Sequence, residues 1–208
     1  WHGAPLARTW DICDHTYVVL GLLEAHRYLG SPHYLEAARR IGDLCWNTLA
    51  TGGIEITDLG NHHGMSATVL LDAAVELHAA SGERRYLDLA LLVLDQADRH
   101  PRLALLRQLA AGTDVSEVGT GKAYQLLWNL VGLAKLHRAT GESKYLQAAL
   151  NGWHSIGAHH LTLDGGPWGG SAHRSREVFN AANAFDRHAY VETCSTLAWI
   201  QLNRELLS

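Results

Sequence analysis

The sequence has few cysteines, little basic charge and no long hydrophobic run, and each shortage argues against a class of protein. Its three cysteines, Cys13, Cys45 and Cys194, form neither an even disulfide framework nor a closely spaced pair. This leans towards a reducing, cytoplasmic compartment without fixing it. No apolar run approaches the roughly 20 residues that span a bilayer, so we expect no membrane partner. With 18% charged residues and a formal net charge of −4, the chain also lacks the basic character needed to bind nucleic acid.

The hydrophobic content, by contrast, is ample. A chain of 208 residues with 47% hydrophobic content can bury one sizeable core, and we interpret residues 1–208 as a single domain. The sequence opens on Trp1 and not on Met, which indicates a processed or excised piece. The composition leaves a homo-oligomer open.

Three segments share the pattern Gly-x-x-x-Tyr-Leu, and they begin at Gly30, Gly82 and Gly141. A glycine in this position ends the preceding helix in the left-handed conformation. The Tyr-Leu pair then starts the apolar stripe of the next helix, with apolar residues recurring at helical spacing. The pattern therefore predicts three helical hairpins and an all-α fold.

Hairpins of this length are typical of either an open α-solenoid or a closed α/α toroid. A toroid of six hairpins needs twelve helices, and the sequence predicts about seven. The last predicted helix, from about Ser195 to Leu207, has no partner after it. The chain is therefore expected to form part of a ring or an open array.

Two polar segments, the loops at 50–62 and 161–187, interrupt the helical pattern and are the places where chemistry is expected. Just after the second loop stand Glu192 and Cys194, whose carboxylate and thiolate are ligands that zinc accepts. On a helix, side chains two residues apart diverge, so chelation requires the helix to begin after this pair. The alternative is a helix-capping Glu192 beside a buried Cys194.

Further side chains in these segments are candidates for sugar chemistry. Glu177 lies 15 residues before Glu192, and two carboxylates flanking one pocket are what glycoside cleavage commonly requires. Trp168 offers a flat face for a sugar ring, or else plugs the loop against the core. His63, in the segment Asn61-His62-His63-Gly64 at the head of a helix, either lines the same site or only caps the helix.

The C-terminal segment resembles a known family. Glu192-Thr-Cys194-Ser-Thr-Leu-Ala, ending in Asn203-Arg204-Glu-Leu-Leu, is similar to the Glu-Thr-Cys helix of the β-L-arabinofuranosidases of glycoside hydrolase family 127. The Gly-Gly loop at 165–170 and the polar run to Glu177-Val-Phe179 follow the order of that family. His63 stands where the family has a sugar-contacting histidine. The specific part of the resemblance is the stretch 165–207.

The resemblance implies a fold, a cofactor and a reaction. The family's (α/α)6 barrel holds a zinc ion bound by one Glu and three Cys, one of which attacks the anomeric carbon, while a separate Glu is the acid/base. Carried over, Glu192 and Cys194 would be zinc ligands and Glu177 the acid/base. The expected function is a retaining, zinc-assisted cysteine glycosidase that releases terminal L-arabinofuranose-like sugars from a small carbohydrate or glycoconjugate.

The chain also departs from the family pattern, which leaves two other functions open. The family takes its nucleophile from a downstream Cys-Cys pair that this sequence lacks, and Lys122 stands where a histidine is common. The first alternative is a non-catalytic helical module that binds sugar or protein. This alternative predicts that the protein binds no zinc. The second is a metal-free toroid epimerase or hydrolase, in which His63 or His188 is essential and Cys194 is dispensable.

Overall fold

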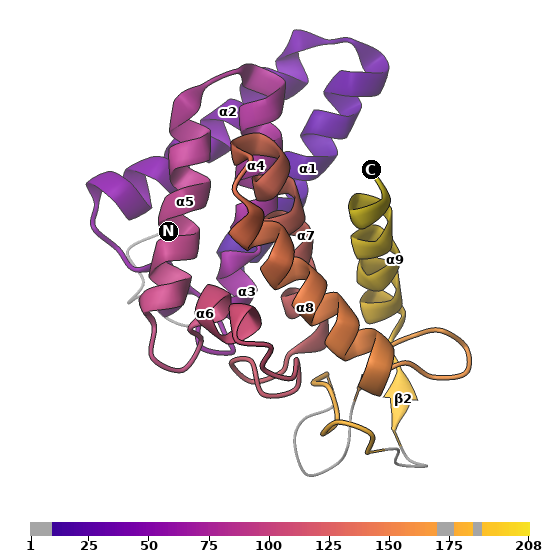
Figure 1. Ribbon diagram of the computed structural model, residues 1–208. Helices are drawn as coiled ribbons and strands as arrows, with labels where there is room; N and C mark the ends of the chain where they lie inside the picture. Colours follow the sequence, from indigo (N-terminus) through magenta and orange to yellow (C-terminus); the bar gives the residue numbers. More distant parts are fainter. Residues whose placement is uncertain (1–9, 170–176, 185–188) are drawn as a thin grey trace. The chain divides into compact units, whose positions relative to one another are not determined.

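The computed structural model describes residues 10–169, 177–184 and 189–208 (Figure 1). Its contacts divide the chain into two compact units, residues 1–100 and residues 101–208, called unit 1 and unit 2 below. Within the described ranges the regular secondary structure is helical except for one pair of two-residue strands and isolated bridges. The predicted all-α class is confirmed, and the single domain stays a prediction.

Unit 1 contains two long helical hairpins. Helix α1 packs against α2, α4 packs against α5, and α1 also contacts α4. Between the hairpins the chain passes through a π-helical turn, a 3-10 turn and the short helix α3; the 3-10 turn lies within the loop predicted at 50–62, and α3 follows it. The elements are α1 (Asp11–Leu29), α2 (Pro32–Trp46), η1 (Asn47–Thr51), η2 (Ile56–Leu59), α3 (Met65–Thr68), α4 (Leu70–Ser81) and α5 (Arg84–Arg99).

Unit 2 contains the third hairpin and the C-terminal helix. Helix α7 packs against both α8 and α9, and the short helix α6 lies on α8. Strands β1 and β2 pair antiparallel, with Trp168 opposite Val191. The elements are α6 (Leu105–Ala110), α7 (Ala123–Thr140), α8 (Ser143–His159), β1 (Trp168–Gly169), β2 (Tyr190–Val191) and α9 (Thr193–Leu207).

The three repeated glycines end their helices as predicted. Gly30, Gly82 and Gly141 have φ angles of 71°, 72° and 74°, in the left-handed region that favours glycine. In each turn the glycine N–H donates to the carbonyl oxygen four residues earlier, as helix C-caps do. The hairpins expected from the sequence are confirmed.

Each turn also carries a histidine four residues before its glycine. The ring nitrogen Nδ1 of His26, His78 and His137 lies 2.9, 2.9 and 3.1 Å from the carbonyl oxygen of the residue after the glycine. Because a carbonyl oxygen only accepts hydrogen bonds, Nδ1 is the protonated nitrogen in each ring. These histidines fasten the start of one helix to the end of the other, so three of the fourteen histidines have a structural role.

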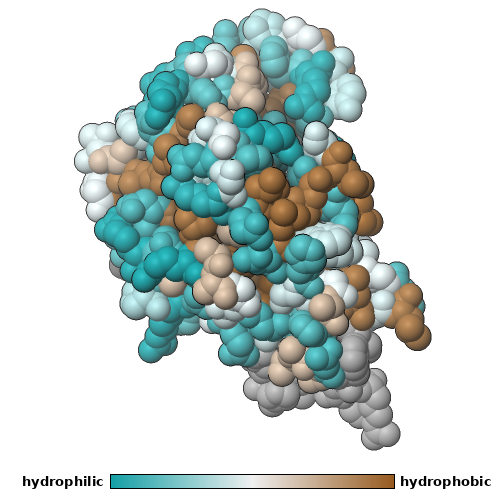
Figure 2. All heavy atoms as spheres, in the orientation of Figure 1, coloured by the Kyte–Doolittle hydropathy of each residue, from teal (hydrophilic) through white to brown (hydrophobic). Residues whose placement is uncertain are grey.

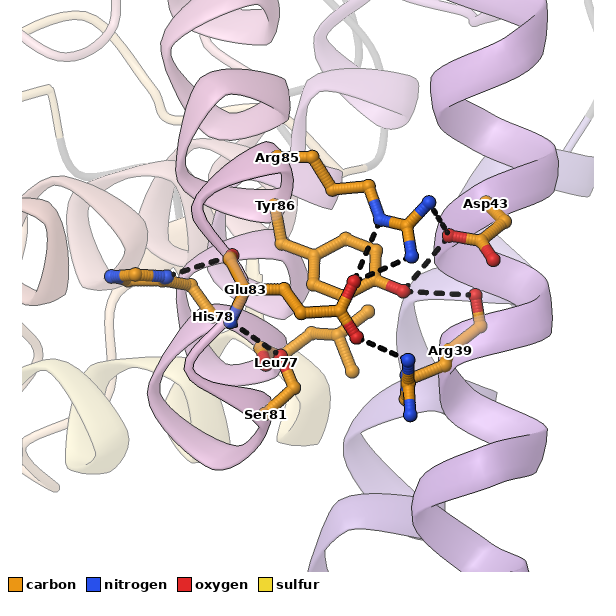
Figure 3. Close-up of polar contacts among 8 residues, drawn as sticks. All are labelled: Arg39, Asp43, Leu77, His78, Ser81, Glu83, Arg85 and Tyr86. Carbon is orange, nitrogen blue, oxygen red and sulfur yellow. Dashed lines mark hydrogen bonds and ion pairs between the residues drawn. The ribbon is translucent and has the colours of Figure 1, made fainter.

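The contact between α2 and α5 shows why the hairpin motif needs its tyrosine. Tyr86 is fully buried, and a Cβ at Gly42 would lie 2.8 Å from its ring atom Cε1 and 2.4 Å from Leu77 Cδ2. The Tyr86 hydroxyl donates to Asp43 Oδ1 at 2.9 Å (Figure 3). Burial, reinforced by the Asp43 carboxylate, raises the pKa of Tyr86 to about 12. The missing side chain at Gly42 therefore makes room for the tyrosine ring.

The surface mixes polar and apolar side chains, as Figure 2 shows for one face. On α9, Leu197, Ile200 and Leu207 are exposed by 58%, 60% and 89%. Among the described residues, no helix is both long and apolar enough to cross a membrane.

Candidate functional site

Lys122, immediately before α7, anchors the most unusual polar cluster of unit 2. Its side chain is buried, with 4% exposure, and its Nζ forms an ion pair with Glu177 Oε2. The backbones of the two segments are also joined, because Ala123 N–H donates to the Glu177 carbonyl at 3.0 Å and Phe179 N–H donates to the Gly121 carbonyl at 2.8 Å. Two segments far apart in the sequence are thus held together at the start of α7.

The residues next to this pair explain why it forms there. Gly121 has a φ of 68°, and a Cβ at this position would lie 2.6 Å from the Ser116 carbonyl oxygen, so only glycine fits the turn before Lys122. On the other segment, Val178 and Phe179 are buried, and the Phe179 ring packs on His160 with 5.0 Å between centroids. Apolar anchors therefore hold the segment that presents Glu177.

Glu192 and Cys194 meet at the start of α9. Helix α9 begins at Thr193, so its expected start at about Ser195 is wrong, although the Glu192 carboxylate still lies close enough to the Cys194 thiol to affect its pKa. The physical reason is that Glu192 precedes the helix in an extended conformation, with φ −90° and ψ 130°. That chelation requires the helix to begin after this pair stays a prediction. The capping alternative does not fit either, since Glu192 makes no side-chain cap hydrogen bond and Cys194 is only partly buried.

Burial and neighbouring groups shift the pKa of the Cys194 thiol. Burial raises the pKa of Cys194 to about 11, and the hydrogen bond to Glu192 and the charge of that carboxylate act in the same direction. The Ser195 hydroxyl and the positive charge of Lys122 act against the rise. Lys122 therefore lies within electrostatic reach of Cys194 while it pairs with Glu177.

The Glu192 carboxylate has an unusual feature that bears on metal binding. Its Oε2 atom is buried and has no hydrogen-bond partner within the described ranges. A buried carboxylate oxygen without a partner is costly, and a cation is the kind of ligand that would satisfy it. Glu192 and Cys194 thus fit two positions of a zinc site. The part of the chain that the structure describes contains no group of three or more His, Cys, Asp or Glu suited to a metal ion.

The remaining sequence candidates are placed separately. Trp168 pairs through its backbone with Val191, beside Glu192, but its side chain lies outside what the structure describes, as does the whole of His188. His63 belongs to unit 1, where it heads α3 with φ 61° and stacks on His100 with 5.7 Å between centroids. The structure therefore describes Glu177, Glu192 and Cys194 within unit 2, and the two expected sugar contacts stay predictions.

Gly166 in the 161–187 loop has a packing role. A Cβ at Gly166 would lie 2.3 Å from Val191 Cγ1 and 2.8 Å from Thr196 Oγ1. Only a residue without a side chain lets this loop lie directly on β2 and the first turn of α9. The loop can therefore reach the segment that carries Glu192.

Sequence reasoning missed Gln125, which lies almost one helical turn after Lys122 on α7. It is buried, and its amide oxygen Oε1 has no hydrogen-bond partner among the residues that the structure describes. The signal was available in the sequence, because Lys122, Gln125 and Asn129 recur at helical spacing at the start of an otherwise apolar helix. Buried polar groups are normally hydrogen-bonded, so the unpartnered amide oxygen of Gln125 makes this side of α7 a candidate for ligand contact.

A second carboxylate in unit 2, Asp114, is fully hydrogen-bonded. It accepts from the Ser116 hydroxyl at 2.6 Å, the Ser155 hydroxyl at 2.8 Å and His160 Nε2 at 3.0 Å. Burial by itself raises the pKa of Asp114, but these hydrogen bonds outweigh it and lower the pKa to about 2. A surface pocket of about 360 Å³ borders Asp114 and Asn151. Because its oxygens are already in use, Asp114 fastens a loop to α8.

With this geometry in view, comparison with known proteins identifies the family. The model of the β-L-arabinofuranosidase GH127 catalytic domain matches residues 9–208. The chain belongs to this family. Among curated proteins, no match is found.

Solved structures support the fold. A GH127 β-arabinofuranosidase matches 95% of this chain with a TM-score of 0.70 and 20% identity. A GH127 β-L-arabinofuranosidase from Geobacillus stearothermophilus T6 matches 96% of the chain with a TM-score of 0.69 and 19% identity. The chain spans only 30% and 34% of those two proteins. The fold expected from the resemblance, helical hairpins forming part of the toroid of these glycosidases, is confirmed.

Proposed function

We propose that this GH127 domain supplies the acid/base and two zinc ligands of a retaining glycosidase acting on terminal L-arabinofuranose-like sugars. The observation that carries the proposal is that the buried ammonium group of Lys122 pairs with Glu177, while its charge also acts on the Cys194 thiol, which interacts with Glu192. Hairpin packing alone does not require a buried lysine paired with a half-exposed carboxylate, or a carboxylate beside a thiol at the start of α9. A glycosidase of this family has a use for each of them.

Glu177 is suited to proton transfer. Its side chain is 47% exposed, so it can reach a substrate from a backbone that Ala123 and Phe179 hold in place. As an acid it would protonate the leaving glycosidic oxygen, and as a base it would take a proton from the water that releases the sugar. His63 and Trp168 are proposed to contact the sugar.

Glu192 and Cys194 are proposed to hold the zinc ion. When bound, zinc supplies a positive charge that keeps thiols ionised near neutral pH. The Oε2 atom of Glu192 would gain the partner it lacks among the described residues. Because the pKa of Cys194 is about 11, its thiol must lose a proton when it becomes a ligand. The resemblance assigns the attacking cysteine to a downstream Cys-Cys pair, which the sequence does not contain.

The first experiment tests the acid/base. Glu177→Gln, made in the longest native form of the protein, should lower turnover of an arabinofuranoside by about 10²- to 10⁴-fold, the usual contribution of a positioned acid/base. Zinc content, measured by metal analysis, should not change. Normal turnover in this variant would remove Glu177 from the mechanism.

The second experiment tests the metal. Stoichiometric zinc in the native protein should be lost in Cys194→Ala and kept in Cys45→Ala, a control that removes a buried thiol elsewhere. Absence of zinc from the native protein would contradict the proposal and favour the non-catalytic module. Full activity of Cys194→Ala would favour the metal-free toroid enzyme instead.

A further inference from the structure

We propose that Lys122 is a positioning residue that holds the Glu177 carboxylate in the orientation needed for proton transfer. This inference rests on the proposed acid/base role of Glu177. It concerns a residue at which this chain departs from the pattern it resembles, since histidine is common there.

The burial of Lys122 is the first argument. An ammonium group taken out of water is costly unless it is paired, and the ion pair that the structure gives Lys122 is with Glu177 Oε2. The lysine backbone is fixed as well, because Lys122 forms a bridge with Val178, the neighbour of Glu177. The cation is thus a rigid point, and the half-exposed carboxylate takes its orientation from it.

The second argument concerns which oxygen of Glu177 pairs with Lys122. Because Lys122 pairs with Oε2, the other oxygen of Glu177, Oε1, is left to carry the exchangeable proton. A carboxyl group held by one oxygen presents the other in a defined direction, and near-attack geometry of this kind is a large part of catalytic rate.

A second ion pair in unit 2, made by a residue of α7, shows how an effect on orientation differs from an effect on stability. Arg138 pairs with Glu205 of α9, where the carboxylate is the buried partner, with 6% exposure. Breaking that pair leaves a buried charge without its cation, which costs stability. Breaking the Lys122 pair leaves Glu177, which is 47% exposed and can be hydrated. Loss of Lys122 should therefore disturb orientation more than folding.

The test uses Lys122→Met and Lys122→Arg in the longest native form, with aryl arabinofuranosides whose leaving groups differ in acidity. Poor leaving groups depend on protonation and good ones do not, so Lys122→Met should lower kcat by roughly 10- to 100-fold for the poorest leaving group and by less than about 3-fold for the best. Lys122→Arg, which keeps a cation, should recover most of the loss. Zinc content should stay constant in both.

A double-mutant cycle shows whether Lys122 acts through Glu177. In the Glu177→Gln background, Lys122→Met should produce no further loss, because residues that act as a unit are not additive. Arg138→Met is the matched control: it should lower the urea midpoint of unfolding but affect all leaving groups equally.

Each outcome bears on a different statement. An equal loss of kcat across all leaving groups in Lys122→Met, or a further full loss in the Glu177→Gln background, would overturn the positioning role. If Lys122→Met is fully active while Glu177→Gln is impaired, this inference alone fails. If Glu177→Gln is fully active, the proposed function fails first.

Discussion

The turn between α4 and α5 and the cluster around Lys122 use similar side chains in opposite ways. In the turn, His78 Nδ1–H donates to the Glu83 carbonyl at 2.9 Å, and the Glu83 carboxylate lies between Arg39 and Arg85 at 2.5 Å from each (Figure 3). In the cluster, the Oε2 atom of Glu192 is buried without a hydrogen-bond partner among the described residues.

This difference distinguishes polar side chains that stabilise the fold from polar side chains that are available for function. A polar group with its partners in place contributes to folding, whereas a buried group without a partner costs free energy and persists only if something else uses it. The comparison predicts that changes in the satisfied region reduce stability, and that changes in the unsatisfied cluster reduce metal binding or turnover while stability hardly changes. Three predictions test it, from the largest effect on stability to the smallest.

Tyr86→Ala should have the largest effect on stability. The side chain is fully buried, and its removal leaves a cavity beside Gly42, so the free energy of unfolding should fall by about 3–5 kcal/mol. The equivalent change in the first copy of the motif, Tyr34→Ala, should cost less than about half as much because Tyr34 is only partly buried. Urea unfolding of the two variants measures the difference. Equal losses would show that the contribution of this tyrosine to the free energy of unfolding does not depend on its burial in each copy.

Asp114→Asn should have an intermediate effect that depends on pH. Because hydrogen bonds lower the pKa of Asp114 from 3.8 to about 2, the carboxylate stabilises the folded state by about 2 kcal/mol at pH values above about 4. This contribution is lost as the pH falls through about 2. Unfolding at several pH values should therefore show a deficit in the variant at pH 7 that disappears between pH 4 and 2. A deficit independent of pH would assign the effect to packing.

Glu192→Gln should have the smallest effect on stability. In metal-free protein the carboxylate has a buried oxygen without a described partner, so its replacement should leave the free energy of unfolding within about 0.5 kcal/mol of the native value. Zinc affinity should fall at the same time, as titration with the metal would show. A loss of stability as large as that of Asp114→Asn would show that Glu192 stabilises the fold as Asp114 does. The contrast between hydrogen-bonded and unpartnered carboxylates would then be wrong.

The hairpins could be predicted from the sequence because their cause is local. Gly30, Gly82 and Gly141 each stand where a helix must end in a left-handed residue, and the apolar spacing after them fixes the buried face. The start of α9 was placed two residues late, because the extended Glu192 and the helical Thr193 differ in backbone conformation and not in residue pattern.

The candidate site was predictable only in part. The Glu-Thr-Cys segment and Glu177 stand out by their resemblance to a family, but no local pattern connects Glu177 to Lys122, which pairs with it across a distant part of the chain. In the sequence, Lys122 stands out only as a departure from that family pattern, and Gln125 only through its helical spacing from Lys122 and Asn129.

The sequence by itself determined the helical hairpins, the all-α class and the family, since each rests on spacing or on residue order along the chain. Only the tertiary structure decided which polar groups are satisfied, because hydrogen bonding and burial depend on neighbours brought together by packing. Asp114 and Glu192 are both acidic residues in unit 2. Three side-chain donors and the Ser116 backbone N–H surround the Asp114 carboxylate, whereas a buried oxygen of Glu192 has no described partner, which directs the search for function to Glu192.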